Sequence, residues 1–135
     1  MLKLIIGVKG TGKTKTLINL VNTAVENSHG DVVCIEKGTK LRYDVKYTAR
    51  LIDVNEFFVS DTQALYGFVA GILASNHDVT DLFIDSALKI CNNDVEAFDK
   101  FVDQLNELAA KVNVKVTITS SIPVEEASET VKKYL

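Results

Sequence analysis

Apolar residues along the chain alternate between short unbroken runs and stripes with a helical period. Such runs are typical of strands buried on both faces of a parallel sheet, and the stripes are typical of helices that cover it. The pattern predicts an α/β protein, a three-layer αβα sandwich with a mostly parallel sheet of about five strands. We expect these strands at 2–6, 31–36, 49–54, 81–85 and 114–119.

Polar residues mark where the intervening helices should start and stop. Starts are expected near residues 13, 60, 94 and 123. Ser60 followed three residues later by Gln63 is a capping-box pattern, and Pro123 suits the first turn of a helix. Gly30 stands where the first helix should end. In the segment 37–54 the pattern predicts only one or two strands, near its end.

The composition is that of an ordinary globular protein. The chain has 135 residues, of which 47% are hydrophobic and 24% charged, and this favours one folded domain over 1–135 and excludes disordered classes. A formal net charge of -3 argues against general binding to nucleic acids or membrane surfaces. Without an apolar run of roughly 18 residues or a secretion signal, we expect a cytoplasmic protein with no membrane insertion. The isolated Cys34 and Cys91 indicate neither a zinc site nor a disulfide.

The clearest chemistry follows the first expected strand. The pattern G-x-x-x-x-G-K-[ST] is matched there by Gly7, Val8, Lys9, Gly10, Thr11, Gly12, Lys13 and Thr14, with Lys15 next. Such a loop between a strand and a helix lets backbone N–H groups surround phosphate oxygens at the positive helix end. Lys13 is expected to neutralise the β- and γ-phosphates, and Thr14 to offer its hydroxyl to Mg²⁺. The alternative is a structural glycine turn, and a chance match has a frequency of about half a percent for a chain of this length.

This motif resembles that of the P-loop NTPase superfamily. The resemblance implies a parallel sheet with ATP or GTP held on the loop together with Mg²⁺. The second motif of the superfamily is an apolar strand that ends in aspartate, and it is matched by Leu82, Phe83, Ile84 and Asp85. The resemblance implies that Asp85 binds Mg²⁺ through water, opposite Thr14. The alternative is an aspartate that caps a turn.

The surroundings of Asp85 are most similar to the RecA-like branch. Asp85 is followed by Ser86 and not by the glutamate that many hydrolytic members carry there. In the RecA-like branch this glutamate ends the strand after the phosphate-loop helix, which is the place of Glu36, so Glu36 is the candidate general base. A solvated strand end is the other interpretation of Glu36. By the same resemblance a side chain within 117–121 would sense the γ-phosphate, although a helix cap formed by Ser121 or its neighbours is the favoured interpretation.

Both arginines of the chain lie in the segment from Lys37 to Arg50. These are Arg42 and Arg50, and the same segment holds Lys40, Tyr43, Lys46 and Tyr47. Three interpretations remain open: a solvated loop with an edge strand, a patch for a protein partner or nucleic acid, and an arginine finger for the nucleotide of a neighbouring subunit. The third interpretation implies a homo-oligomer.

Together these residues predict a compact ATPase. We expect Mg-dependent binding of a nucleoside triphosphate, with slow hydrolysis that depends on Lys13 and Glu36. ATP is preferred over GTP because the base-reading motif N-K-x-D of GTPases is absent. The alternatives are a nucleotide-binding module without turnover and, less favoured, a small-molecule kinase, which would need an arginine-rich lid. A partner or a second copy could complete the site.

Overall fold

The computed structural model describes residues 2–135. Its strands are β1 (Leu2–Ile6), β2 (Asp31–Glu36), β3 (Arg50–Asp53), β4 (Val79–Ile84) and β5 (Lys115–Ser120). Its helices are α1 (Lys13–Asn27), α2 (Thr62–Ser75), α3 (Ala87–Ile90), α4 (Val95–Val112) and α5 (Glu129–Lys132), with 3₁₀ turns η1 (Val54–Phe57) and η2 (Val124–Glu126). Each strand lies within two residues of its expected bounds, because unbroken apolar runs are a local signal.

All five strands form one parallel sheet in the order β1-β5-β4-β2-β3. This confirms the predicted α/β class. β5 lies between β1 and β4, and its Val116 pairs with Leu2 on one side and Leu82 on the other. The strand before the glycine-rich loop is thus separated by one strand from the strand that precedes Asp85. The carboxyl ends of all five strands share one edge of the sheet, which is where ligands bind in open α/β sheets.

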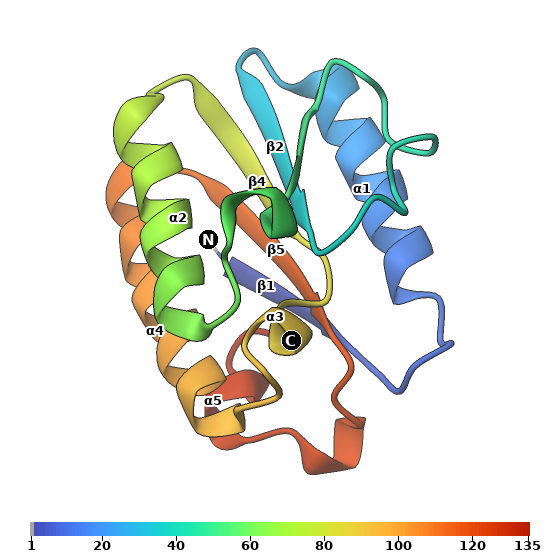
Figure 1. Ribbon diagram of the computed structural model, residues 1–135, viewed down its shortest axis with the longest axis vertical. Coiled ribbons are helices and arrows are strands. Elements are labelled where there is room, and N and C mark those ends of the chain that lie inside the picture. Colours follow the sequence, from blue (N-terminus) through green and yellow to red (C-terminus); the bar gives the residue numbers. More distant parts are fainter. Residues whose placement is uncertain (1) are drawn as a thin grey trace.

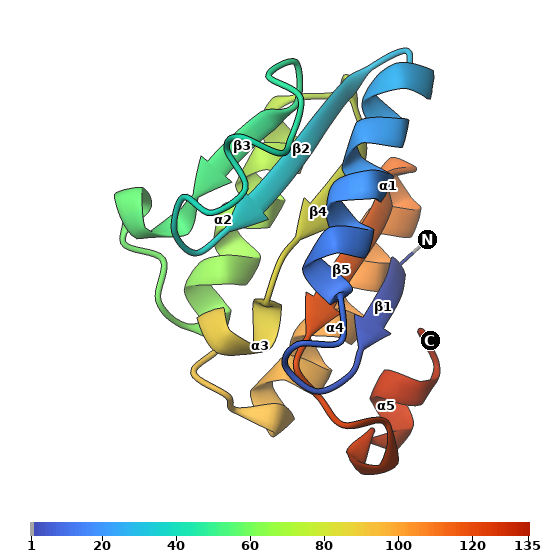
Figure 2. The same ribbon diagram turned by 90° about the vertical axis from the view of Figure 1, so that its right-hand side faces the viewer.

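Helices cover both faces of the sheet, which gives three layers (Figure 1). One face is covered by α1 and the segment 37–49, which Figure 2 shows in front of β2 and β4. The side chains buried there include Leu17, Val21, Leu41 and Val45. The opposite face is covered by α2 and α4, whose buried side chains include Leu65, Val69, Phe98, Val102 and Leu105. Because both faces are covered, the central strands carry apolar residues in succession.

The start of α2 differs from its prediction. The carboxylate of Asp61, and not the hydroxyl of Ser60, caps this helix by accepting a hydrogen bond from the N–H of Ala64 at 2.8 Å. The capping box of Ser60 and Gln63 is therefore wrong by one residue. Asp94 caps α4 in the same way, which agrees with the predicted helix start near residue 94. Aspartate, serine and threonine are all good caps, so the local sequence around residue 60 offered competing choices.

Two other helix ends also differ. α1 ends three residues before Gly30, where a β-carbon would lie 2.2 Å from the carbonyl oxygen of Asp78. Gly30 thus permits a close approach between two chain segments and is not a helix cap. The continuous helix expected from Pro123 is wrong, because η2 is followed by a separate α5. Ser128 caps α5 by accepting from the N–H of Val131 at 3.1 Å.

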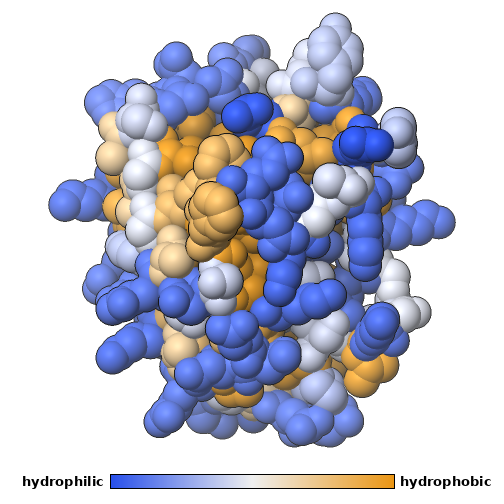
Figure 3. Space-filling model, in the orientation of Figure 1, coloured by the Kyte–Doolittle hydropathy of each residue, from blue (hydrophilic) through white to orange (hydrophobic). Residues whose placement is uncertain are grey.

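An apolar patch lies near the centre of the face shown in Figure 3, between η1 and α2. Phe57 and Phe58 are the exposed aromatic residues of this region. The ring of Phe57 packs against that of Phe68 on α2, with 5.5 Å between centroids. This contact ties the segment after the edge strand β3 to the helical layer.

Candidate phosphate-binding site

The glycine-rich loop joins the carboxyl end of β1 to α1. A β-carbon at Gly7 would lie 2.7 Å from Thr11 Oγ1, and Gly7 has a φ of 152°. Gly12 has a φ of 85° and directly precedes α1. Both positions favour glycine, since a side chain would clash at the first and be strained at the second. The sequence motif is therefore explained by the backbone path of the loop.

The loop is closed by two side chains that donate to one carbonyl. Lys13 Nζ donates to the carbonyl oxygen of Val8 at 2.9 Å, and Thr11 Oγ1 donates to the same oxygen at 2.8 Å. Within residues 2–135, no side chain caps the start of α1 and no acidic residue lies in its first turn. The first N–H groups of α1 are thus available at the positive end of the helix dipole, which suits an anion.

Asp85 lies directly after β4 and faces the start of α1. The hydroxyl of Thr14 is 3.3 Å and 3.4 Å from the two carboxylate oxygens of Asp85. Thr119 Oγ1 donates to Asp85 Oδ1 at 2.7 Å. Asp85 is 9% exposed, so its carboxylate is held by hydroxyl groups in a largely buried position. The structure therefore brings together the two residues that the sequence proposes as ligands of Mg²⁺.

The end of β5 holds the turn that follows Asp85. The hydroxyl of Thr119 accepts from the N–H of Ser86 at 2.8 Å, and the hydroxyl of Ser120 accepts from the N–H of Leu88 at 3.3 Å. Both hydroxyl groups are buried. The favoured prediction that Ser121 or its neighbours cap the helix expected from Pro123 is wrong, because no side chain within residues 2–135 caps η2 and this end of β5 holds Asp85 and α3 instead. The hydroxyl-rich sequence was the available signal, but its partners depend on the position of β5 beside β4.

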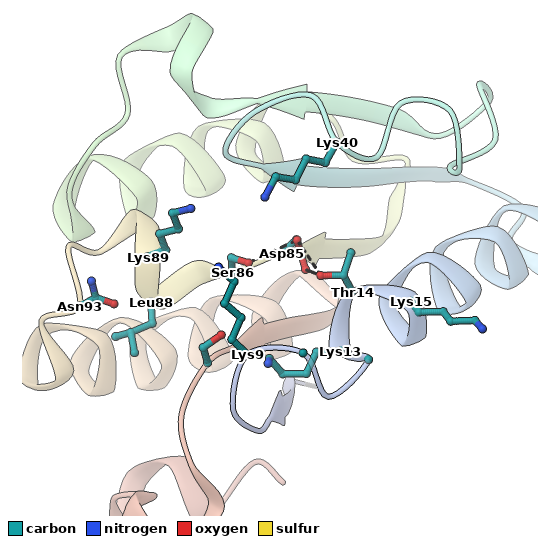
Figure 4. A pocket seen from close by; sticks show the side chains of 13 residues that line it. Lys9, Lys13, Thr14, Lys15, Lys40, Asp85, Ser86, Leu88, Lys89 and Asn93 are labelled. Carbon is teal, nitrogen blue, oxygen red and sulfur yellow. Dashed lines mark hydrogen bonds between the residues drawn. The ribbon is translucent and has the colours of Figure 1, made fainter.

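A cavity of about 480 Å³ opens between the glycine-rich loop and the carboxyl ends of the strands. Its lining carries five lysines and one carboxylate, namely Lys9, Lys13, Lys15, Lys40, Lys89 and Asp85, and continues with Gly10, Gly12, Thr14, Ser86, Leu88, Asn93 and Ser121. Figure 4 shows Lys9 and Lys13 on one side, Lys40 and Lys89 on the other, and Asp85 and Thr14 between them. This excess of positive charge attracts anions.

Several residues proposed from the sequence do not line this cavity. Gly7, Val8 and Thr11 are absent from its lining and instead make contacts within the loop. Lys40 and Lys89, by contrast, line the cavity although the motif did not point to them. No local pattern could have found these two lysines, because they reach the cavity only through the packing of the segments that carry them.

Glu36 ends β2 next to the cavity but is not part of its lining. Its side chain is 3% exposed, and its two carboxylate oxygens accept from the N–H groups of Lys40 at 3.1 Å and Leu41 at 3.2 Å. Burial raises the pKa of Glu36 above its ordinary value, the two N–H groups oppose that change, and the charges of Asp85 and Asp53 raise it further. Glu36 is therefore not a solvated strand end.

Both arginines lie away from the cavity. Arg42 stacks on Tyr43, with 4.9 Å from its guanidinium carbon to the ring centroid, and it also donates to the Tyr43 hydroxyl at 3.0 Å. Tyr43 and Tyr47 are 85% and 96% exposed. Arg50 stands on the edge strand β3. An arginine finger on another subunit and a nucleic-acid contact both stay predictions.

The oxygens of Thr14 and Asp85 suit magnesium. Mg²⁺ prefers hard oxygen ligands and keeps several waters, so one hydroxyl and one carboxylate suffice when phosphate and water supply the rest. Across residues 2–135 no group of three or more His, Cys, Asp and Glu side chains gathers into a metal site of its own. In the same residues no helix is long and apolar enough to cross a membrane.

Comparison with solved structures shows that the chain shares its fold with a known protein. No known family matches the sequence, and no curated protein matches it. A KaiC-like protein from the hyperthermophilic archaeon Pyrococcus horikoshii superposes with a TM-score of 0.71 at 16% sequence identity. The chain has a KaiC-like, RecA-type fold. The match covers 98% of this chain and 66% of the KaiC-like chain, and at this identity it shows the fold alone.

Proposed function

We propose that the chain binds a nucleoside triphosphate with Mg²⁺, prefers ATP, and hydrolyses it slowly. The observation that carries this proposal is the meeting of Thr14 and Asp85 beside the glycine-rich loop, in a cavity with five lysines. The fold it shares with a KaiC-like protein supports the same conclusion. The preference for ATP rests on the sequence alone.

The residues of the loop would bind the phosphates. The free N–H groups of α1 and the loop would donate to phosphate oxygens, and Lys13 would exchange its bond with the Val8 carbonyl for the β- and γ-phosphates. Mg²⁺ bound by Thr14 and Asp85 would neutralise charge on the phosphates. Thr119 would keep the Asp85 carboxylate oriented, because it donates to Asp85 Oδ1 at 2.7 Å.

Hydrolysis by this chain alone should be slow. Asp85 is the one carboxylate among the described residues that line the cavity, and it is assigned to the metal. Glu36 remains the predicted general base, yet both its oxygens accept backbone N–H groups and it would have to leave them to reach a water. This observation favours, as the second candidate function, a nucleotide-binding module without turnover. A kinase is less favoured because neither arginine lines the cavity.

Binding and turnover separate these functions. We expect Mg-ATP and Mg-GTP to bind the wild type, with ATP tighter, and Lys13→Ala to abolish binding of both. Lys111→Ala is the matched control, since Lys111 lies exposed at the far end of α4. Equal binding by wild type and Lys13→Ala would overturn the proposal.

Phosphate release should then be measured across protein concentration. Turnover per molecule that rises with concentration would indicate a site completed by a second copy, with Arg42 or Arg50 as candidate contacts. Turnover that is constant would indicate a complete site in one chain. Tight binding with no release at any concentration would select the module without turnover.

A further inference from the structure

A short turn after β2 is fixed by two carboxylates. Glu36 and Asp53 end the neighbouring strands β2 and β3 and are paired in register. Glu36 accepts from the N–H groups of Lys40 and Leu41, and Asp53 Oδ1 accepts from the N–H of Gly38 at 2.8 Å. Leu41 is buried against α1. The backbone of residues 38–41 therefore has one defined position.

This turn points one lysine into the cavity. The side chain of Lys40 lines it on the side opposite the glycine-rich loop (Figure 4). Lys37, on the same turn, is exposed and does not line it. The ion pairs among residues 2–135 engage Lys46, Lys132 and Lys133, which leaves the Lys40 ammonium free to meet an anion.

The turn lies beside the proposed magnesium ligand. The N–H of Asp85 donates to the carbonyl oxygen of Ile35 at 2.8 Å, and Ile35 is paired with Ile84. Glu36 and Asp85 are therefore the next residues along two neighbouring strands. A triphosphate held by the loop would have its inner phosphates at α1, and Mg²⁺, which Thr14 and Asp85 would hold, would neutralise charge on its outer phosphates. Asp85 and Lys40 both line the cavity, so the terminal phosphate of such a ligand would lie toward the part of the lining that carries Lys40.

We propose that Lys40 binds the terminal phosphate and makes the site prefer a nucleoside triphosphate over a diphosphate. Glu36 acts through Lys40 as a positioning residue, because its carboxylate fixes the N–H of Lys40 itself. This inference rests on the proposed function. In this proposal Lys40 of the same chain contacts the terminal phosphate, and no arginine from a second subunit is needed for that contact.

The test compares affinities for Mg-ADP and for an ATP analogue with an imido group between its outer phosphates. Lys40→Met keeps the backbone N–H and the apolar stem but removes the charge. Loss of one charge-assisted hydrogen bond to the terminal phosphate should reduce the preference for the triphosphate about tenfold, with ADP affinity unchanged. Lys40→Arg should restore the preference, and the matched control Lys37→Met should leave it intact. Lys89→Met should weaken both ligands alike.

Glu36→Gln separates positioning from base catalysis. Gln has one acceptor oxygen and places an NH₂ group against the remaining N–H, so the turn should loosen and the preference for the triphosphate should fall. A general base would instead lose turnover and keep the preference. If Glu36→Gln proves unfolded by circular dichroism, Lys40→Met alone decides.

The outcomes are distinct. A wild type that binds neither nucleotide overturns the proposed function and this inference with it. A wild type that binds both equally, or a Lys40→Met variant that keeps the full preference, overturns the inference alone. Loss of the preference in Lys89→Met but not in Lys40→Met would also overturn it.

Discussion

Replacing Thr119 by valine should expose how much the site depends on one buried hydroxyl. Valine has nearly the shape of threonine, so the change removes two hydrogen bonds without leaving a large cavity. The N–H of Ser86 would lose its acceptor and Asp85 would lose its shortest donor, while residue 119 is only 1% exposed. The Ser86 N–H left without its acceptor should cost about 1–3 kcal/mol, and the bond lost by Asp85, which keeps its contact with Thr14, about 1 kcal/mol, so the free energy of unfolding should fall by roughly 2–4 kcal/mol.

Denaturant titration and thermal unfolding measure this loss. For a protein of this size a change of 1 kcal/mol moves the melting temperature by about 3 °C, so we expect a decrease of roughly 6–12 °C. Thr117→Val is the matched control, because Thr117 lies two residues earlier on the same strand and is only half-buried. A substitution of that kind should stay within about 0.5 kcal/mol.

A second measurement separates the effect of Thr119 on stability from its effect on the proposed magnesium site. Because Thr119 orients Asp85, Thr119→Val should also lower the affinity for Mg²⁺ by about 10–100-fold. Mg²⁺ should then strengthen nucleotide binding less than it does in the wild type. Equal stability of Thr119→Val and Thr117→Val would refute the reasoning about the buried hydroxyl. A lower stability with unchanged magnesium dependence would refute the orienting role alone.

Three further predictions follow from single contacts. Gly7→Ala would place a methyl group 2.7 Å from Thr11 Oγ1, so ATP affinity should fall about tenfold or more with an unchanged circular dichroism spectrum; retained affinity would contradict this. Burial raises the pKa of Glu36 above its ordinary 4.5, so the folded protein keeps a proton that the unfolded chain releases. As pH rises from 4.5 through that raised pKa, the unfolding free energy of wild type should fall relative to Glu36→Gln in denaturant titrations, whereas parallel pH profiles would contradict the shift. Burial and then the bond to Asp103 at 2.6 Å raise the pKa of Tyr134 to about 12, so an ultraviolet titration should show a late tyrosine that Tyr134→Phe removes.

The sequence by itself was enough to predict features that depend only on residues close together in the chain. The bounds of β1 and β2, and the start of α1 at Lys13, agree with the apolar runs and the motif. The glycine-rich loop is explained within its own residues, because Gly7 and Gly12 occupy positions where a side chain would clash or be strained. The sequence did not decide which of two adjacent residues, Ser60 or Asp61, caps α2.

The strand order was decided only by the tertiary structure. β5 lies between β1 and β4, and this places Thr119 against Asp85, 34 residues earlier in the chain. No local period or motif encodes which strands become neighbours, because that choice depends on the packing of every helix at once. The resulting contact changed the interpretation of the hydroxyl-rich segment from a helix cap to a brace for Asp85.

The surroundings of Glu36 were decided in the same way. The sequence predicted that Glu36 ends β2, but it did not predict the burial of Glu36 or its hydrogen bonds to Lys40 and Leu41. A strand-end carboxylate can face water, a metal or a backbone turn, and only the folding of residues 37–41 over the end of the sheet selects among these. The sequence thus determined which groups the chain carries, and the tertiary structure determined which of them meet, because burial and hydrogen-bond partners arise between segments far apart in the chain.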